Sequence, residues 1–138
     1  MKQLAPSILS ADFICLGEQL KQLQKLCIHY LHIDVMDGMF VPSISFGMPV
    51  IASLRKHTDM FFDVHLMIEE PIRYVNALRQ AGADGLTVHA EACADLPGTI
   101  AAIRESGAKP AVCLSPKTPL SKLDGILAVS YTHLRAHE

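Results

Sequence analysis

The fold is decided by the stretch His32-Ile33-Asp34-Val35-Met36-Asp37-Gly38. An apolar run that stops at an Asp-Gly turn is typical of a buried strand, and a period of two places His32, Asp34 and Met36 on one face. An imidazole and a carboxylate on one face can share a metal ion, although a single pair of this kind is more often hydrogen-bonded in a core. The next apolar run, residues 61–67, contains a second histidine, His65, and this recurrence favours the metal interpretation.

The composition is that of an ordinary globular domain. The 138 residues are 50% hydrophobic and 19% charged, with a net charge of −2, which is enough for one domain with a core. The absence of a Lys/Arg block argues against nucleic acid or an anionic membrane surface as partner. No apolar run could span a bilayer, and residues 1–6 do not resemble a signal peptide. Four cysteines without a C-x-x-C pair predict reduced thiols in a cytoplasmic protein.

Strands and helices are expected to alternate along the chain. The apolar pattern predicts strands at residues 4–10, 30–35, 61–66, 86–89 and 110–114. Helices are expected to follow them at residues 13–26, 49–57, 71–81, 96–106 and 120–127. The connection at residues 37–47 is long and apolar for a solvated loop, so we expect it to form a lid or a wall of a site.

Strands joined through helices run parallel, which leaves two architectures: an open doubly wound sheet and a (β/α)₈ barrel. The open sheet usually has a glycine-rich turn after its first strand, and residues 10–13 contain no glycine. Polar side chains instead end successive expected strands, at Ser7, Asp34, His65 and His89. Convergence at the carboxyl ends of strands is typical of a barrel. The sequence therefore predicts an α/β fold of the (β/α)₈ TIM-barrel class, truncated to about five βα units.

Several motifs together resemble ribulose-phosphate 3-epimerase. They are APSILSADF at residues 5–13, HIDVMDGMFVP at 32–42 and DVHLM at 63–67, followed in order by AGAD at 81–84, HAE at 89–91 and PKTP at 116–119. The resemblance covers about residues 4–127. It implies a cytoplasmic isomerase of the pentose phosphate pathway, which interconverts D-ribulose 5-phosphate and D-xylulose 5-phosphate through a metal-stabilised enediolate. The implied cofactor is a divalent cation, zinc first, with iron, manganese or cobalt as alternatives.

The resemblance also implies roles for individual residues. The metal ligands would be His32, Asp34 and His65, and Asp34 would in addition be one of two acid/base carboxylates. The substrate-binding residues would be Ser7, His65, Met36 and Met67. For the methionines, core filling is an equal alternative to an apolar lining over the enediolate. Asp63 could orient a ligand histidine or accept a structural hydrogen bond, and His89 and Glu91 are expected to support the wall of the site.

The chain departs from the family pattern at two places. Ser115 stands where the family usually has asparagine, and the residues after about 128 match nothing in it. We expect residues 1–128 to be the N-terminal part of a ribulose-phosphate-binding barrel, and residues 129–138 to be an unrelated read-through tail without the alternation of a strand. The family's second acid/base aspartate and its phosphate-binding loops belong to strands six to eight, so this chain is expected to be inactive alone.

Two alternatives to this function remain open. One is a hexulose-phosphate enzyme, allulose-6-phosphate 3-epimerase, and the other is a non-catalytic fragment. A decarboxylase or synthase of the same barrel class is disfavoured, because residues 32–34 lack the lysine of an Asp-x-Lys-x-x-Asp motif. The expected partners are a small sugar phosphate and, in a full-length parent, further copies of the chain in a homo-oligomer, with no nucleic acid and no membrane.

Overall fold

A computed structural model describes residues 4–126 and 132–135. Within that part of the chain, the strands form one parallel sheet in the order β1-β2-β3-β4-β5. The strands are β1 Tyr30–Met36, β2 Phe61–Met67, β3 Gly85–His89, β4 Lys109–Leu114 and β5 Thr132–Arg135. Every strand pairs with the next one along the chain, whereas a doubly wound sheet reverses its order at a switch point. The sheet is therefore a section of barrel wall, as the sequence predicts.

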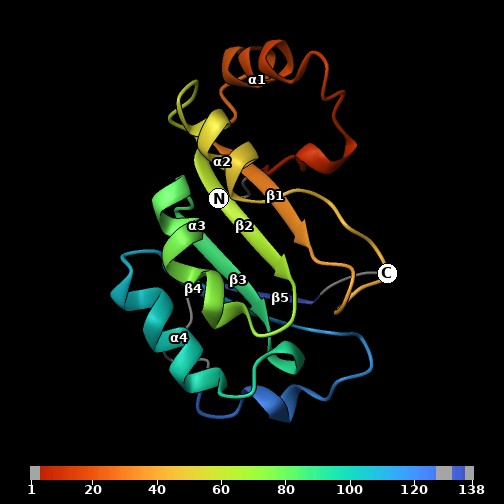
Figure 1. The fold of residues 1–138 in the computed structure, drawn as a ribbon, viewed down its shortest axis with the longest axis vertical. Coiled ribbons are helices and arrows are strands. Elements are labelled where there is room, and N and C mark those ends of the chain that lie inside the picture. The colour runs from red at the N-terminus through yellow and green to blue at the C-terminus, as the bar shows by residue number, and fades with distance from the viewer. Residues whose placement is uncertain (1–3, 127–131, 136–138) are drawn as a thin grey trace.

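The helices cover one face of this sheet. They are α1 Leu16–Lys25, α2 Met48–Arg55, α3 Val75–Ala81 and α4 Leu96–Glu105. Figure 1 shows α2, α3 and α4 side by side in front of the strands, with α1 apart from them at the top of the view. Within the described residues, no helix is both long and apolar enough to cross a membrane.

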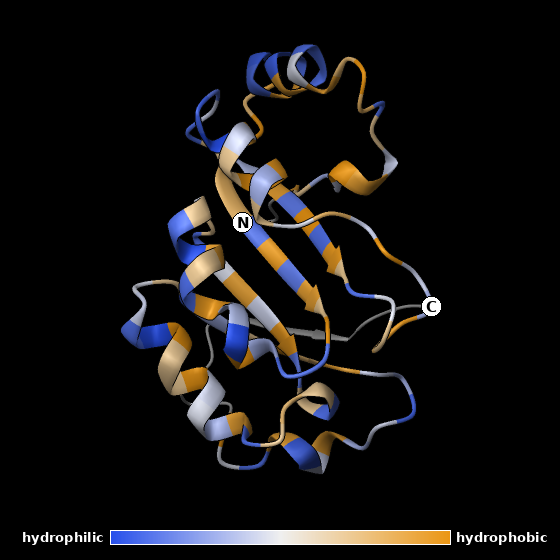
Figure 2. Cartoon of the chain, viewed as in Figure 1, coloured by the Kyte–Doolittle hydropathy of each residue, from blue (hydrophilic) through white to orange (hydrophobic). Residues whose placement is uncertain are grey.

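The strands present two chemically different faces. Alternating hydrophobic and hydrophilic bands run along β1 and β2 (Figure 2). The apolar set, which includes Ile33, Val64 and Leu86, is fully buried and forms one core with Ile51 and Leu78 of the helices. Burying an aliphatic side chain contributes about 1.5–3 kcal/mol, so this face holds the sheet to its helices. The opposite face is left to the polar side chains.

Aromatic rings close the amino-terminal end of the polar face. The rings of Tyr30 and Phe61 lie 4.8 Å apart, and Lys109 Nζ lies 5.2 Å from the centre of the Phe61 ring. A Cβ atom at Gly85 would come within 3.1 Å of that ring, which explains why the neighbouring strand begins with glycine. The polar side chains that could do chemistry lie further along the strands.

The strand expected at residues 4–10 is reduced to a single bridge. Ser7 pairs with His32, and Pro6 O accepts a hydrogen bond from the His32 N–H at 2.9 Å. The chain then turns into the 3₁₀ helix η1, Ile8–Ser10, because Ser7 Oγ accepts the Leu9 N–H and offers the backbone an alternative to the sheet. The prediction of a full first strand was wrong.

Other boundaries also differ from the sequence expectations. Helix α1 begins at Leu16 rather than near residue 13, because Asp12 accepts the Ile14 N–H at 3.0 Å and holds a separate turn. The helix expected at residues 71–81 divides into the 3₁₀ helix η2, Pro71–Tyr74, and α3, and the last expected helix is the short 3₁₀ helix η4, Leu120–Leu123.

The expected tail contains a strand. The sequence of residues 129–138 lacks the alternation of a strand, yet Thr132–Arg135 forms β5 and pairs in parallel with β4. The proposed division after residue 128 lies among residues 127–131, outside the described part of the chain, and it stays a prediction.

Candidate metal centre

The parallel pairing of β1 and β2 brings the three predicted metal ligands together. Asp34 lies opposite His65 in the register, and His32 is two residues before Asp34 on the same face. Asp34 Oδ1 lies 3.1 Å from His32 Nε2 and 3.2 Å from His65 Nδ1. One donor atom from each residue lies within 4.8 Å of the others. Two imidazoles and a carboxylate are a suitable donor set for zinc and related divalent ions, so these residues could hold a metal.

Hydrogen bonds keep Asp34 in its charged form. Its side chain is largely buried, and Ser7 Oγ donates to Asp34 Oδ2 at 2.6 Å. Burial opposes ionisation, but the hydrogen bonds from His32, His65 and Ser7 outweigh it and hold the pKa of Asp34 well below its usual range. The sequence predicted that Ser7 binds the substrate. In the structure its hydroxyl donates a hydrogen bond to the carboxylate of Asp34.

Asp63 orients His32. Asp63 Oδ2 lies 3.0 Å from His32 Nδ1, which leaves Nε2 of the same ring directed at Asp34. Burial lowers the pKa of His32, but its contacts with Asp34 and Asp63 dominate and raise it to about 9. A carboxylate behind a histidine is the usual way of fixing the ring of a metal ligand. Of the two roles left open for Asp63, this contact favours the orientation of a ligand histidine over a purely structural hydrogen bond. The histidine that it contacts is His32, on the neighbouring strand, and not His65.

The two predicted substrate-lining methionines lie beside the same centre. Met36 and Met67 are partners in the register, two residues beyond Asp34 and His65 on the same face of the sheet, and both are half-buried. The structure therefore brings them to the carboxyl end of the polar face, and their role as substrate lining stays a prediction.

The loop at residues 37–47 is fastened over this end of the strands. Ser45 Oγ donates to Asp34 O at 2.7 Å and accepts the Met36 N–H at 3.0 Å. The Phe40 ring lies 4.9 Å from the ring of His89. The loop thus forms a wall of the polar face, as expected, and Ser45 is a positioning residue that sequence reasoning missed because only the fold brings it back to β1.

Asp37 fixes the start of that wall. Its Oδ1 accepts the N–H groups of Met39 and Phe40 at 2.9 and 3.0 Å, and its Oδ2 accepts the N–H of Glu69, after β2, at 2.8 Å. Slight burial opposes ionisation, but these backbone N–H groups prevail and lower the pKa of Asp37. Gly38 follows with a φ of +76°, which a side chain rarely adopts.

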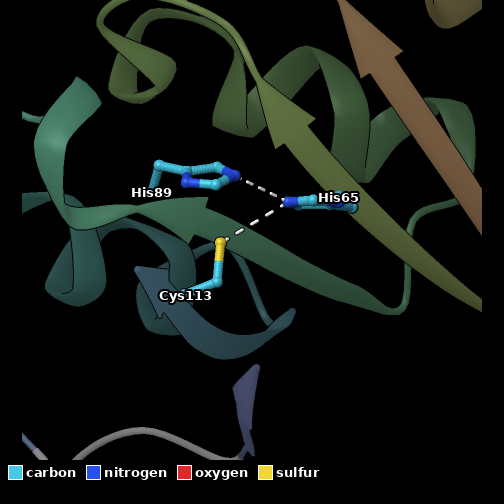
Figure 3. A group of neighbouring side chains, drawn as sticks. All are labelled: His65, His89 and Cys113. Atoms are coloured by element: carbon cyan, nitrogen blue, oxygen red, sulfur yellow. Dashed lines mark hydrogen bonds between the residues drawn. The ribbon is translucent and has the colours of Figure 1, made fainter. Parts of the chain in front are cut away.

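A second cluster shares His65 with the first. Figure 3 shows His65 of β2, His89 of β3 and Cys113 of β4 converging, with His65 Nε2 2.9 Å from His89 Nε2 and 3.4 Å from Cys113 Sγ. Burial lowers the pKa of His89 and raises the pKa of the Cys113 thiol to about 12. Sequence reasoning treated Cys113 as an ordinary reduced thiol. Its register partner is His89, and this pairing, which the sequence does not reveal, places its sulfur on the polar face.

Glu91 lies behind this second cluster. Its Oε2 is 3.6 Å from His89 Nδ1, and its Oε1 accepts the Ser115 N–H at 2.8 Å. Burial opposes ionisation of Glu91, but hydrogen bonds from Thr118 and the Ser115 backbone lower its pKa. The supporting position expected for His89 and Glu91 fits these contacts.

Solved structures with the same arrangement are barrel proteins. Tryptophan synthase subunit alpha from Legionella pneumophila superposes with a TM-score of 0.65 at 17% identity, over 98% of this chain and 62% of that one. A mutant of the same subunit from Pyrococcus furiosus gives a TM-score of 0.66 at 14% identity, over 96% and 64% of the two chains. At these identities the likeness concerns the fold alone, and that fold is of the TIM-barrel type.

Curated relatives are much more similar in sequence. Ribulose-phosphate 3-epimerase from Bacillus subtilis is 51% identical over 126 residues, which cover 91% of this chain and 58% of the relative. The enzyme of the same name from Rhodobacter capsulatus is 43% identical over 128 residues, 93% of this chain and 56% of the relative. The chain thus spans little more than half the length of the curated relatives that it matches. Residues 3–134 match the Ribulose-phosphate 3 epimerase family, and the chain belongs to that family.

Proposed function

We propose that this chain forms the N-terminal part of a ribulose-phosphate 3-epimerase that interconverts D-ribulose 5-phosphate and D-xylulose 5-phosphate. The observation that carries the proposal is the placement of a charged, buried Asp34 between His32 and His65, at the carboxyl end of a barrel wall. Barrel enzymes have their active sites at that end of the strands.

Inversion at carbon 3 requires a base that removes its proton, and an acid that returns a proton to the opposite face. Asp34 would serve at one face, because its hydrogen bonds hold it in the ionised form, which is the form that can accept a proton. Asp63 and Ser7 would hold His32 and Asp34 in place, as they do in the structure. A divalent ion at His32, Asp34 and His65, zinc in first place, would supply positive charge to the oxygens of the enediolate.

Activity is proposed for a polypeptide longer than these 138 residues. The chain covers 58% of the Bacillus relative, and we propose that the second acid and the phosphate-binding loops lie in the remaining part. A sugar phosphate without its anchor loses binding energy that positions the reacting carbon, so the chain alone should give no turnover. A homo-oligomer and a cytoplasmic location are also proposed, and a relative named as a cytoplasmic isoform in Oryza sativa, 43% identical, supports the location.

A chimera tests the proposal. Residues 4–126 of this chain would replace the matching segment of the Bacillus subtilis epimerase, and turnover of D-ribulose 5-phosphate would be measured in a coupled assay. The chimera should be active, and Asp34→Asn should lower its kcat by about 10²–10⁴-fold, because the proton acceptor is lost. Asp59→Asn, at an exposed carboxylate, is the matched control and should change nothing.

Full activity of the Asp34→Asn chimera would overturn the proposal. The same chimera assayed with allulose 6-phosphate addresses the hexulose alternative, since preferred turnover of that substrate would favour it. Circular dichroism of each chimera separates a loss of chemistry from a loss of folding.

A further inference from the structure

Three metal-ligating side chains meet in the second cluster, outside the centre formed with Asp34. His65, His89 and Cys113 come from three successive strands and expose 5%, 3% and 0% of their surfaces. His65 Nε2 is the common point, with His89 Nε2 at 2.9 Å and Cys113 Sγ at 3.4 Å (Figure 3). One donor atom from each of the three lies within 4.8 Å of the others.

Hydrogen bonding alone satisfies this arrangement poorly. A ring nitrogen carries either one hydrogen or one lone pair, so His89 Nε2 and the Cys113 thiol compete for His65 Nε2, and the thiol has the Val88 backbone oxygen at 3.5 Å as its other partner. His89 Nδ1 is buried and has no hydrogen-bond partner among the described residues. A buried polar atom without a partner is rare in a folded protein, so the side chains present do not fully satisfy this ring.

The surroundings of His89 are those of a metal ligand. A histidine that binds a metal through Nε2 carries its hydrogen on Nδ1, and that hydrogen usually faces a carboxylate. Here Glu91 Oε2 lies 3.6 Å from His89 Nδ1, and the Ser115 N–H fixes the other oxygen of Glu91 at 2.8 Å. The carboxylate needed behind the ligand is therefore already in place.

We propose that His65, His89 and Cys113 form a second metal site, which takes a thiophilic divalent cation of the Zn²⁺ class. Binding forms one metal–sulfur and two metal–nitrogen bonds, and the thiol proton of Cys113 goes to solvent with no change of oxidation state. Tetrahedral zinc holds N and N about 3.4 Å apart, and N and S about 3.6 Å apart. The observed 2.9 and 3.4 Å therefore need to open by only a few tenths of an ångström.

The shared histidine links the two sites. His65 directs Nδ1 at Asp34 and Nε2 at the second cluster, so a chain with both sites filled holds His65 as a bridging imidazolate that has released its ring proton. Binding at one site therefore changes the affinity of the other. The second site goes beyond the proposed function, because the scheme proposed for epimerisation gives Cys113 no role.

Cobalt titration of the 138-residue chain tests the site. Co²⁺ bound to a thiolate gives a charge-transfer absorption band in the near ultraviolet, which oxygen and nitrogen ligands do not give. The chain should develop this band, Zn²⁺ should abolish it by displacement, and Cys113→Ser should lack it. Cys93→Ser is the matched control, because Cys93 Sγ lies 3.3 Å from the backbone oxygen of His89 without belonging to the cluster.

Two further measurements separate the alternatives. His32→Asn removes a ligand of the Asp34 centre but none of the second site, so this variant should keep the band. The test of the second site therefore does not depend on whether the proposed epimerase function is correct. X-ray absorption of the zinc-loaded unmodified chain should show one Zn–S bond of about 2.3 Å, independently of any variant. A folded chain with no band and no Zn–S bond overturns the proposal, as does a band that survives Cys113→Ser.

Discussion

Asp37 concentrates several backbone hydrogen bonds on one carboxylate. Because N–H groups of Met39, Phe40 and Glu69 stabilise the ionised form, its pKa is lower in the folded chain than in the unfolded one. A group of this kind contributes stability above its unfolded pKa of about 3.9, and the contribution is lost as the pH falls through the folded pKa.

The Asp37→Asn variant should show a weaker dependence of stability on pH in acid. The free energy of unfolding, measured with urea between about pH 2 and 5, should fall less steeply for the variant as the pH is lowered, because the titrating group is gone. Asp59→Asn, at an exposed position, should follow the unmodified chain. Parallel curves for the unmodified chain and Asp37→Asn would contradict this reading of the carboxylate.

The sequence predicted the first cluster better than the second. The period of a strand pairs His32 with Asp34, the recurrence of a histidine in the next apolar run points to His65, and the resemblance to the epimerase family implies the three together as ligands. The partner of Asp63 could not be predicted, since it depends on the register that sets His32 opposite Asp63. Cys113 was missed for the same reason, as only the pairing with His89 brings its sulfur to the polar face.

Arg55 connects three secondary-structure elements: helix α2, strand β2 and the turn that follows α3. It ends α2, its guanidinium lies 3.9 Å from the centre of the Phe62 ring of β2, and its Nη1 donates to Asp84 Oδ2, after α3, at 2.9 Å. Its Nη2 donates to the backbone oxygens of Thr58 and Met60 before β2. One planar side chain with several donors thus fixes the angle between helix and sheet.

Replacement of Arg55 by methionine should destabilise the chain by about 2–4 kcal/mol, because Asp84 loses its nearest cation and two backbone oxygens lose the guanidinium donor while the apolar volume is kept. Urea unfolding measures the change. Arg73→Met, at an exposed arginine 5.4 Å from the Tyr74 ring, should cost less than about 1 kcal/mol. Equal losses of unfolding free energy in Arg55→Met and Arg73→Met would show that Arg55 does not fix helix α2 to the sheet.

The elements whose ends were misjudged are those where a side chain competes with the backbone. The Ser7 hydroxyl accepts the Leu9 N–H, and the first strand ends after one bridge. The Asp12 carboxylate accepts the Ile14 N–H and holds a turn that delays the start of α1. Such local hydrogen bonds do not change the apolar pattern from which the elements were predicted. The central strands were located to within one or two residues, because burial on the helix-covered face leaves a continuous apolar signal.

For the whole molecule, the order of the strands was predictable because each helix returns the chain to the neighbouring position in the sheet. The strand β5 was not, since residues 132–135 carry no apolar alternation. Two metal sites on one sheet would couple binding to folding, because unfolding separates strands β1 to β4 and scatters the ligands.

Zinc should therefore raise the stability of the whole chain. In a Cys113→Ser background, which leaves only the Asp34 centre, zinc at 100 times its dissociation constant should add about 2.7 kcal/mol to the free energy of unfolding, and a chelator should reverse the gain. The gain should vanish when Asp34→Asn is added, as followed by thermal unfolding. A gain of equal size in the double variant would place the ion elsewhere.

The Asp37 carboxylate also limits how the mouth of the polar face can open. Because one side chain accepts hydrogen bonds from the segment after β1 and from the segment after β2, moving either segment outward alone breaks a hydrogen bond at Asp37. Displacements of these two connections are therefore energetically coupled through one carboxylate, and protonation of that carboxylate would weaken the coupling.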